Sequence, residues 1–479
     1  MLDTRVPEGE ILRQREYMRL VEAMPGRPET YHIVSMGCQM NERDSETIAG
    51  MFEEMGMSRE PVRERADLIL YNTCCVRENA DLILYNTCCV RENAENRALG
   101  NVIWLKELKK DRPELMICVG GCMPQEPGMA EVMRKKYPFI DLIYGTHNLY
   151  RLPENLYRAL RDRKPVVEVV QTDGEIVEGL PEARNSALSA FVNIMYGCDN
   201  FCTYCIVPYV RGRERSRAPE DVIDECLRLR DAGVKEITLL GQNVNSYRGG
   251  GAEFANLLYR LDRLGIERIR FMTSHPKDLS DELIAAYAEL PHLMPHLHLP
   301  VQSGSDEVLR AMNRRYGRGR YLDLVRRLRA ARPEIGLTTD IIVGFPGETE
   351  AQFEETMSLV EEVRFDSAYT FIFSPRTGTR AASMPDGTPA EVKSARIQKL
   401  IARQTEITAE ILRGQIGRRE TVLVEGASAR DAGSVSGRTP RALTVNFPGG
   451  EELIGRFVDV EITSAGRNTL RGRIVEEEE

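Results

Sequence analysis

The chain has 479 residues, 42% of them hydrophobic, and a formal net charge of −9. This length is enough for two or three domains that each bury a core. The negative charge argues against a protein that coats nucleic acid nonspecifically, because such binding depends on neutralising phosphates. No window of about 18 residues is continuously apolar, and the N-terminal region lacks the apolar core of a signal peptide. We therefore expect no membrane segment and a cytoplasmic location.

The first predicted domain covers residues 29–148, where apolar runs alternate with amphipathic stretches. The apolar runs are YHIVSMG, ADLILYNTC, LMICVGGC and FIDLIYG. This alternation of strand-like and helix-like segments predicts a doubly wound α/β domain with parallel strands. A polar, proline-bearing linker is expected around residues 150–188.

One segment of this domain occurs twice in tandem. ADLILYNTCCVREN occupies residues 66–79 and, identically, residues 80–93. The two copies compete for one strand position, so one of them must form a loop that carries the apolar DLILY. A repeat architecture needs longer units and several copies. A recent duplication, or an error in assembling the sequence, explains the repeat better than a function does.

Three positions in the first domain combine a cysteine with the end of an apolar strand. They are Cys38, Cys122 and either Cys88 or its twin Cys74. The carboxyl ends of parallel strands lie side by side in a doubly wound fold, so these thiols should converge at one edge of the sheet. Eleven cysteines in short-spaced groups favour ligation over disulfides in a reducing cytosol. Three converging thiols indicate an iron–sulfur cluster with one open iron.

Between the twins we prefer Cys88, because its VREN runs unbroken into the helix-like AENRALGNVIWLKELKK, whereas Cys74 is followed by a second DLILY. The neighbouring Cys75 and Cys89 should point the other way and act as spectators. A buried structural cysteine is the alternative for any single position. We accept that alternative for two further cysteines, Cys118 and Cys226.

The second predicted domain, residues 184–413, carries six strand-like runs, each followed by a helix-like stretch. The runs are AFVNIMYG, EITLLGQN, RIRFMTS, HLHLPVQ, GLTTDIIVGF and SAYTFIFS. Six such units predict a partial (β/α)6 barrel, in which chemistry sits at the carboxyl ends of the strands. After a long helix, residues 414–477 switch to short alternating strands broken by Gly, Pro and Asn, which predicts a small β-barrel. The fold class is therefore α/β with an appended β-barrel.

A second cysteine group follows the first strand of the barrel. Cys198, Cys202 and Cys205 form a CxxxCxxC motif within one loop. This spacing lets the loop hold three irons of a [4Fe–4S] cluster and leaves the fourth iron without a protein ligand. A zinc knuckle is the alternative, but zinc requires a fourth Cys or His nearby, and none follows within the next turns.

With an aromatic residue, Tyr204, before its last cysteine, this motif resembles the radical S-adenosylmethionine (SAM) superfamily. The resemblance implies that SAM chelates the open iron and is cleaved by one electron to a carbon radical. It also implies SAM contacts at three further strand ends. Gln242 and Asn243 match the position that contacts the methionine amino group, and Ile342 and Gly344 match the adenine-contacting strand end. One residue, Ser303, is equally open to a ribose contact and to a helix N-cap role.

Two three-cysteine sites followed by a small C-terminal β-barrel resemble the methylthiotransferases, which carry a cluster domain, a radical SAM barrel and a TRAM domain. The wording GCQMNERDSE, NTCCVRENA, LLGQNVNSY and TDIIVGFPGET is most similar to the branch of this family that acts on tRNA. The resemblance implies two [4Fe–4S] clusters, SAM, and a tRNA substrate methylthiolated at carbon 2 of N6-isopentenyladenosine. It further implies a flavodoxin-like or ferredoxin-like electron donor and a monomeric enzyme.

Basic residues at two places are candidates for RNA contact. Arg211 and Arg213 lie just past the second cysteine group, where guanidinium groups match phosphate geometry. Arg438, Arg441 and Phe447 lie in the predicted C-terminal barrel, which the resemblance expects to touch RNA with cations and a stacking ring. A solvated loop with local salt bridges is the alternative for the first pair.

Two other functions compete with tRNA methylthiolation. The first is a methylthiotransferase that acts on an aspartyl side chain of a ribosomal protein. The second is a non-catalytic iron–sulfur protein that binds RNA and uses its clusters structurally. Nucleoside analysis of tRNA distinguishes the first, and formation of deoxyadenosine from SAM distinguishes the second.

Overall fold

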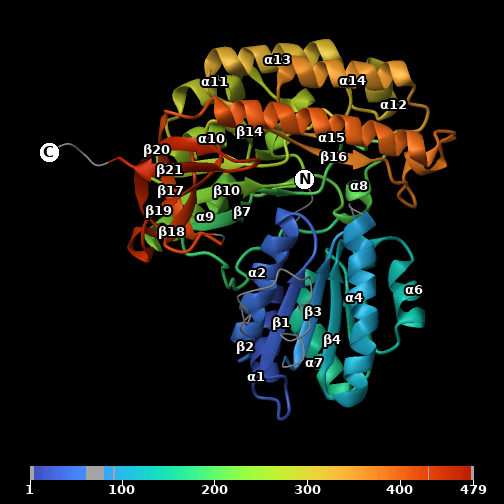
Figure 1. The fold of residues 1–479 in the computed structure, drawn as a ribbon. Helices are drawn as coiled ribbons and strands as arrows, with labels where there is room; N and C mark the ends of the chain where they lie inside the picture. Colours follow the sequence, from blue (N-terminus) through green and yellow to red (C-terminus); the bar gives the residue numbers. More distant parts are fainter. Residues whose placement is uncertain (1–4, 61–79, 90–91, 430, 476–479) are drawn as a thin grey trace. The chain divides into compact units, whose positions relative to one another are not determined.

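The computed structural model describes residues 5–60, 80–89, 92–429 and 431–475 (Figure 1). The chain forms two compact units. The first contains Met1–Asn185 with Met195–Asp199 and Cys205–Ser216, and the second contains Ser186–Ile194, Asn200–Tyr204 and Arg217–Glu479. Among the described residues, no helix is long and apolar enough to cross a membrane.

The first unit is built on a six-stranded sheet with the order β2-β1-β3-β4-β5-β6. Every pair of neighbouring strands in this sheet is parallel. The strands are β1 (Thr30–Ser35), β2 (Ser58–Arg59), β3 (Leu82–Thr87), β4 (Met116–Gly121), β5 (Leu142–Tyr144) and β6 (Val166–Glu168). The prediction of a doubly wound parallel domain is therefore confirmed.

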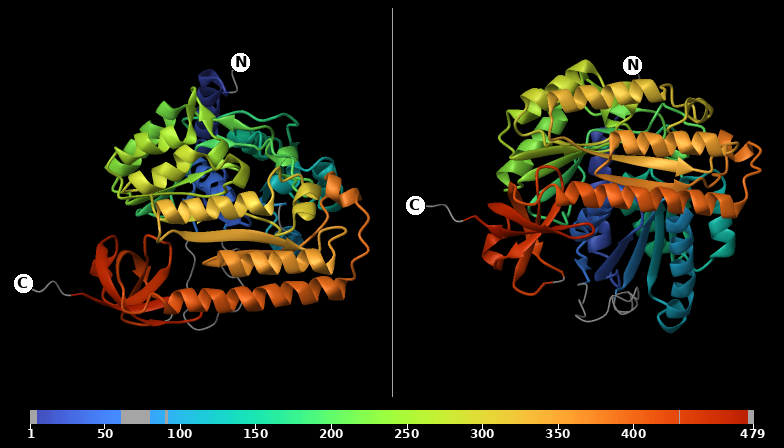
Figure 2. Two further views of the ribbon diagram at one scale, coloured as in Figure 1. Left: turned by 90° about the horizontal axis from the view of Figure 1, so that it is seen from above. Right: turned by 45° about the horizontal axis from the view of Figure 1, so that its top comes forward.

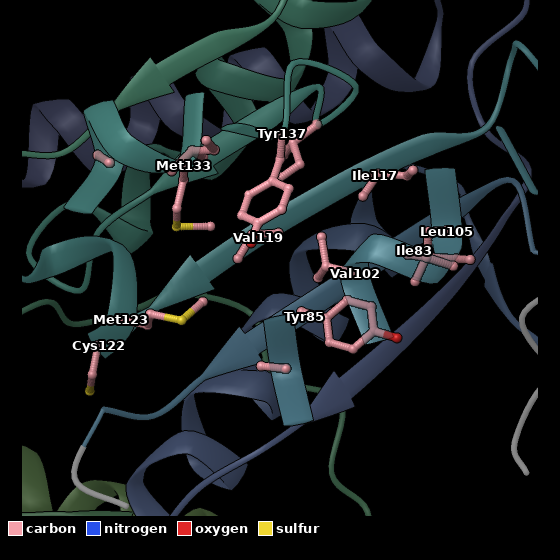
Figure 3. Packing of buried hydrophobic residues seen from close by; sticks show 14 of the residues in the cluster. Ile83, Tyr85, Val102, Leu105, Ile117, Val119, Cys122, Met123, Met133 and Tyr137 are labelled. Carbon is pink, nitrogen blue, oxygen red and sulfur yellow. The ribbon is translucent and has the colours of Figure 1, made fainter. Parts of the chain in front are cut away.

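Helices cover both faces of this sheet because the apolar residues of its central strands alternate in direction. Ile83 and Tyr85 of β3 pack with α4 and α6, and Figure 3 shows this cluster with Cys122 beyond the end of β4. Leu82 and Leu84 pack on the opposite face with α1, α2 and α7. The helices are α1 (Glu8–Glu22), α2 (Gln39–Glu54), α4 (Glu92–Asp111), α5 (Cys122–Gln125), α6 (Met129–Lys136) and α7 (Leu152–Asp162).

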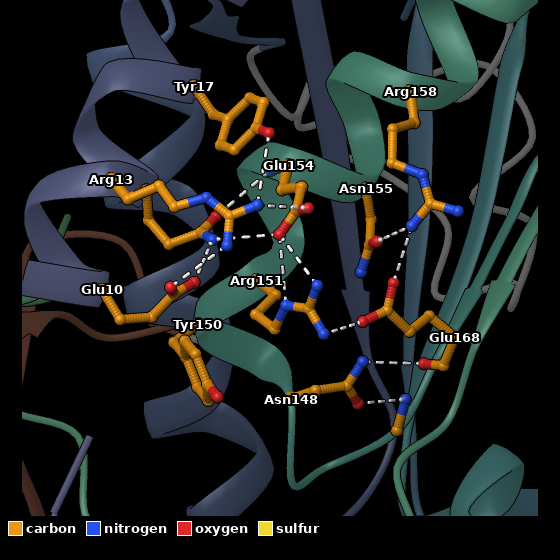
Figure 4. A network of polar contacts seen from close by, with 12 residues as sticks. Glu10, Arg13, Tyr17, Asn148, Tyr150, Arg151, Glu154, Asn155, Arg158 and Glu168 are labelled. Carbon is orange, nitrogen blue, oxygen red and sulfur yellow. Dashed lines mark hydrogen bonds and ion pairs between the residues drawn. The ribbon is translucent and has the colours of Figure 1, made fainter. Parts of the chain in front are cut away.

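The segment predicted as a linker around residues 150–188 is largely structured, so that prediction is wrong for its first half. Helix α7 and strand β6 lie there, and Leu152 and Leu156 are buried in the core. A polar network also ties α7 to α1: Glu154 accepts hydrogen bonds from Arg13 and Arg151 (Figure 4). The amphipathic spacing of the two leucines was the signal for this helix.

The duplicated segment contributes one strand to the described fold. That strand, β3, belongs to the second copy and lies between β1 and β4, with every residue buried. Cys88 follows it directly. The first copy, including Cys74 and Cys75, lies outside the described residues.

The second unit contains six parallel strands in two three-stranded sheets, β13-β10-β7 and β14-β15-β16. They are β7 (Ser189–Asn193), β10 (Glu236–Leu240), β13 (Arg268–Phe271), β14 (His296–His298), β15 (Gly336–Val343) and β16 (Ser367–Ile372). The helices between them are α9 (Pro219–Asp231), α10 (Phe254–Asp262), α11 (Asp281–Glu289), α12 (Asp306–Ala311), α13 (Arg318–Ala331) and α14 (Glu350–Val363). All six predicted β/α units are present, which confirms the partial barrel.

A long helix, α15 (Ala390–Arg413), packs beside β16 and leads into a closed five-stranded barrel (Figures 1 and 2). Its strands are β17 (Arg419–Ala427), β18 (Ser434–Arg438), β19 (Thr444–Pro448), β20 (Phe457–Ala465) and β21 (Leu470–Ile474). The alternation of apolar residues predicts strands in ETVLVEG, ALTVNF, RFVDVEITSA and TLRGRIV, which correspond to β17, β19, β20 and β21, and it does not predict β18. The sequence SVSGR has a single apolar residue, and its Gly437 lies so close to β17 that a Cβ would stand 2.1 Å from the Leu423 carbonyl oxygen.

Candidate functional site

Three cysteines of the first unit follow three adjacent strands. Cys38 comes after β1, Cys88 after β3 and Cys122 after β4, and these strands are neighbours in the order β1-β3-β4. Thr87 pairs with Gly121, so Cys88 and Cys122 each lie one residue beyond a paired position. Parallel strands end at one edge, as predicted, and we call Cys38, Cys88 and Cys122 the auxiliary cysteines.

The loop that carries Cys38 lies directly against Cys88. A Cβ on Gly37 would stand 2.7 Å from the Cβ of Cys88 and 2.6 Å from Oδ1 of Asn41, so only glycine fits there. Asn41 in turn donates to the Thr87 carbonyl oxygen at 3.0 Å. These contacts fasten the loop after β1 to the end of β3.

Cys89 also lies at this edge, which corrects the prediction that it points away. Its thiol hydrogen bonds to Cys122, and both residues belong to one buried cluster. That hydrogen bond, together with the charge of Arg211, lowers the pKa of Cys122 to about 6 despite burial. A lowered pKa favours the thiolate form of Cys122, which is the form that binds metal.

Arg211 is buried beside the auxiliary cysteines, so its predicted RNA contact is wrong. Its Nε donates to the sulfur of Cys122 at 3.2 Å, and its Nη2 donates to Asp44 at 2.8 Å. Burial alone would lower the pKa of Arg211. The negative charges of Asp44, Cys122 and Cys38 outweigh burial and raise that pKa well above its ordinary value.

Of the two arginines predicted to contact RNA after the second cysteine group, only Arg213 is exposed, and the neighbouring Arg215 and Arg217 are buried. Arg213 pairs with Asp199 at 3.0 Å, and both side chains are about half exposed. Arg215 is buried and donates to the carbonyl oxygen of Arg213 at 2.6 Å. Arg217 pairs with buried Glu225 at 2.7 Å. The alternating arginines therefore mostly fasten the loop internally.

The loop that carries the CxxxCxxC motif begins at a glycine whose backbone lies in the left-handed region. Gly197 has a φ of +72°, and a Cβ there would stand 2.0 Å from the Arg213 carbonyl oxygen. The next residue, Cys198, donates its backbone N–H to the Gly212 carbonyl oxygen at 3.2 Å. Gly197 thus lets the loop turn close to the 212–213 backbone. We call Cys198, Cys202 and Cys205 the radical cysteines.

The middle of this loop belongs to the second unit, where the segment after α12 holds it. Thr203 donates to the Ala311 carbonyl oxygen at 2.9 Å, and Asn313 donates to the carbonyl oxygen of Phe201 at 3.0 Å. Arg314 extends Nη1 toward the sulfur of Cys202 at 3.5 Å and the hydroxyl of Tyr204 at 3.4 Å. This fixes the position of Cys202 relative to the barrel.

Arg314 and Asp44 are site residues that sequence analysis misses. Arg314 belongs to a basic stretch whose sequence is indistinguishable from a solvated face. Asp44 stands three residues after Asn41 on the helix that follows Cys38. A spacing of three residues places Asn41 and Asp44 on one face of the helix. This spacing was the sequence feature from which the position of Asp44 at the site could have been predicted.

Unpartnered polar atoms mark the barrel end where SAM contacts were predicted. Asn243 is 1% exposed, and its Nδ2 donates to Asp278 at 2.8 Å, while its Oδ1 finds no hydrogen-bond partner among the described residues. Nε2 of His275, after the neighbouring strand β13, is also buried and has no partner in the described part of the chain. Buried polar atoms of this kind need a ligand or water. Gln242 lies beside Asn243 and is partly buried.

The other predicted SAM contacts have different surroundings. Ile342 and Tyr204 pack against one apolar cluster that includes Phe345. Gly344 has a φ of +67° and donates its N–H to Glu348 at 2.6 Å. The hydroxyl of Ser303 is buried and engages Thr356 and the backbone N–H of Ser305. The N-cap of helix α12 is Ser305 and not Ser303, so the helix N-cap alternative for Ser303 is wrong. The ribose contact of Ser303 stays a prediction.

Two of the three predicted RNA contacts in the C-terminal barrel are wrong. Phe447 is 1% exposed in the barrel core, so its ring cannot stack on a base. Arg441 donates to both carboxylate oxygens of Asp366 at 2.8 Å and is largely buried. Arg438 keeps a partly exposed side chain, paired with Glu425 at 2.6 Å. The Arg441 contact fastens the small barrel to the (β/α)6 barrel.

Both cysteine sets fit iron–sulfur clusters by their donor chemistry. Each offers three thiols on loops that glycine allows to approach closely, and each has one buried arginine that donates to a ligand sulfur. In the described part of the chain, no three His, Cys, Asp or Glu side chains converge as a site for one metal ion. A [4Fe–4S] cluster instead takes its thiolates at separate irons.

Comparison with known proteins divides the chain in three. Residues 192–360 match the radical SAM superfamily and residues 413–475 match the TRAM domain. Residues 30–81 and 77–145 match the uncharacterized protein family UPF0004 in two overlapping pieces, which meet at the duplicated segment. The radical SAM methyltransferase TsrM from Kitasatospora setae shares the fold, with a TM-score of 0.50 and 16% identity over 74% of this chain and 77% of that chain.

Relatives resemble the chain along its whole length. The tRNA-2-methylthio-N(6)-dimethylallyladenosine synthase of Thermoanaerobacter sp. (strain X514) is 49% identical over 476 residues, which cover 98% of each chain. The enzyme of that name from Bacillus subtilis (strain 168) is 49% identical over 94% of this chain and 87% of its own. The chain belongs to the tRNA-2-methylthio-N(6)-dimethylallyladenosine synthase family of radical SAM proteins.

Proposed function

We propose that this protein is a radical SAM methylthiotransferase that converts N6-isopentenyladenosine, next to the anticodon of tRNA, into its 2-methylthio derivative. The observation that carries the proposal is the presence of two three-cysteine sets in a chain whose relatives bear that name over their full length. Carbon 2 of adenine offers neither an acidic proton nor a leaving group. Acid–base chemistry cannot functionalise it, and a radical can.

The radical cysteines hold the first [4Fe–4S] cluster in this proposal. Bound together, that cluster and SAM supply a carbon radical that removes hydrogen from an unreactive carbon. The chain's own part is to orient SAM and to limit the access of water. Asn243 Oδ1 is a buried acceptor suited to an ammonium group, and Tyr204 and Ile342 provide an apolar wall. His275 is neutral, because burial and the charge of Arg314 lower its pKa.

In this proposal the auxiliary cysteines would hold a second [4Fe–4S] cluster, which would supply a site for sulfur. The residues present support this role, because the three thiols follow the ends of neighbouring parallel strands and Arg211 donates to the sulfur of Cys122.

The remaining partners follow from this chemistry. Cleavage of SAM consumes an electron, which we assign to a flavodoxin-like or ferredoxin-like protein. We propose a monomer that works in the cytoplasm, where tRNA is modified. Arg213 and Arg438 are the exposed or partly exposed cations that we retain as RNA contacts.

The proposal is tested in a bacterial strain that lacks its own enzyme of this class. Expression of the full chain should restore the 2-methylthio nucleoside in digested tRNA, measured by mass spectrometry. Cys202→Ala should abolish it. Cys226→Ala is the matched control, because Cys226 is a buried cysteine on α9 outside both sets and its loss should leave the nucleoside in place.

Two different negative results would separate the competing functions. Reconstituted protein that forms no deoxyadenosine from SAM and a reductant is not a radical enzyme. Protein that forms deoxyadenosine but restores no tRNA nucleoside has another substrate, and the aspartyl side chain of a ribosomal protein would then be the next candidate.

A further inference from the structure

The proposed function gives no role to the ion pair buried beside the auxiliary cysteines. Arg211 is 7% exposed and Asp44 is 9% exposed, and their side chains meet at 2.8 Å. A buried guanidinium is unfavourable unless it is paired and its N–H groups find acceptors. Here one N–H of Arg211 is directed at a sulfur, that of Cys122, at 3.2 Å.

The backbone of Arg211 is held on both sides, so its direction is set by the fold. Its N–H donates to the Val207 carbonyl oxygen at 2.8 Å, and its carbonyl oxygen accepts from Arg215 at 3.3 Å. Asp44 approaches from α2 and Cys122 from the start of α5. Three separate segments of the first unit thus meet at one guanidinium group, whereas the nearby Arg213 is about half exposed and pairs with Asp199.

We propose that Arg211, oriented by Asp44, is a positioning residue for the auxiliary cluster and sets its reduction potential. This inference rests on the second cluster of the proposed function. Three thiolates give a [4Fe–4S] cluster a net negative charge, which a buried guanidinium offsets. Hydrogen bonds to the ligand sulfurs and nearby charges are the means by which proteins tune such clusters.

If the ion pair sets the potential, replacing its two members should shift the midpoint potential in opposite directions, which a purely structural role does not predict. Arg211→Gln leaves the negative Asp44 uncompensated near Cys122, so the cluster becomes harder to reduce and its midpoint potential shifts to more negative values. Asp44→Asn leaves the positive Arg211 uncompensated, so the potential shifts to more positive values. Loss of packing alone would not give shifts of opposite sign from two partners of one pair.

The measurement uses the full chain with Cys198, Cys202 and Cys205 replaced by alanine, so that only the auxiliary cluster can load. Iron and sulfide are counted after anaerobic reconstitution, and the midpoint potential is read by electron paramagnetic resonance during a redox titration. Thermal melting of the iron-free protein reports stability. None of these readouts depends on turnover.

Arg43→Gln is the matched control. Arg43 is a buried arginine of the same helix as Asp44, and it pairs with the carboxylate of Glu46 at 3.7 Å and also with that of Glu182. Its replacement should change the melting temperature and leave the cluster potential unchanged. A shift of the potential in this variant equal to that in Arg211→Gln overturns the proposal.

The remaining outcomes distinguish a failure of the role of Arg211 from a failure of the second cluster itself. Opposite shifts in Arg211→Gln and Asp44→Asn support the proposal, and equal, same-sign or absent shifts overturn it while leaving the second cluster intact. If Arg211→Gln loads less iron, Arg211→Lys must restore loading, and failure to do so also overturns it. If the alanine background itself loads no iron, the second cluster of the proposed function fails, and this inference fails with it.

Discussion

At the scale of single residues, each cysteine set is accompanied by a guanidinium group that donates to one of its sulfurs. Arg211 reaches Cys122 at 3.2 Å, and Arg314 reaches Cys202 at 3.5 Å. Both arginines are buried. Because charge-assisted hydrogen bonds are strengthened by burial, each pair fixes a ligand sulfur more firmly than packing alone would.

The twin cysteines give the most direct test at this scale. Cys88→Ala should lose about half of the iron bound by the reconstituted chain, since the proposed auxiliary cluster, one of the two in the proposed function, loses a ligand. Cys74→Ala should lose none, because β3 belongs to the second copy. Iron and sulfide analysis after reconstitution measures both.

Cys89→Ala serves as the control for this pair. Cys89 is fully buried and hydrogen bonds to Cys122 but is not one of the proposed ligands, so its loss should lower stability slightly and retain more iron than Cys88→Ala retains. Retention of full iron by Cys88→Ala together with loss in Cys89→Ala would reassign the middle ligand. Loss in Cys74→Ala would show that the first copy supplies it.

Comparing substitutions at Gly197 and Gly233 tests how much the close approach of Gly197 to the 212–213 backbone matters. Gly197→Ala should prevent loading of the radical cluster and formation of deoxyadenosine, because its Cβ would stand 2.0 Å from a backbone oxygen at a φ of +72°. Gly233 has a φ of +90°, and a Cβ added there would meet no other described residue within 4 Å, so Gly233→Ala should cost only about 1–2 kcal/mol of unfolding free energy from backbone strain. Equal iron content and activity in the two variants would mean that the clash is relieved without harm.

At the scale of elements, periodicity predicted the parts of the fold that bury a continuous apolar face. The six β/α units of the barrel are such parts, as are the four main strands of the first sheet. Helix α7 and strand β6 were missed because a polar, proline-bearing context masked Leu152 and Leu156. Strand β18 was missed because it has few apolar side chains and packs closely against β17 through Gly437 instead. Such close packing leaves no recognisable pattern in the sequence.

The sequence predicted those parts of the candidate site that depend on residues close together in the chain. Cysteines that follow strands, and three cysteines in one loop, are visible in sequence. The Arg211–Asp44 contact joins residues 167 positions apart, and no local pattern distinguishes a buried arginine from a solvated one. The same reason explains the errors at Arg441 and Phe447, since burial of a side chain in a small barrel is a property of its tertiary fold.

The identity of β3 leads to a prediction about the duplicated element. Deletion of residues 66–79 should leave the fold, iron content and activity unchanged. Arg59 and Leu82 both pair with Tyr31, so the end of β2 and the start of β3 lie level on either side of β1. Two strand spacings, about 10 Å, separate these two strand ends. After the deletion about eight residues remain between Arg59 and Leu82, and an extended chain of that length can span roughly 26 Å.

Because the two copies are identical, deletion of either one produces the same chain, and the deletion variant needs no choice between them. Its melting temperature, iron content and tRNA nucleoside product should match those of the full chain. Loss of the auxiliary iron on deletion would mean that both copies are needed at this edge of the sheet.

At the scale of the whole molecule, each unit contains a buried neutral histidine, which makes both units sensitive to acid. In the first unit, burial and the charges of Arg215 and Arg211 lower the pKa of His147 to about 4. In the second, burial and the charges of Arg314, Lys277 and Arg315 lower the pKa of His275. Unfolded histidine has a pKa of about 6.5, so the unfolded chain binds more protons than the folded one below that pH.

Both units should therefore lose stability as the pH falls below about 6.5, and His147 should account for about 2 kcal/mol in the first unit at pH 5. Hydrogen exchange of the iron-free protein, read by mass spectrometry peptide by peptide, measures each unit separately. His147→Gln should reduce the loss between pH 7 and pH 5 in peptides of the first sheet only, and His275→Gln in peptides of the (β/α)6 barrel only. Each variant thus serves as the control for the other. An unchanged loss in both would mean that carboxylates rather than these histidines govern the acid response, and a loss reduced in both units by either variant would mean that the two units unfold together.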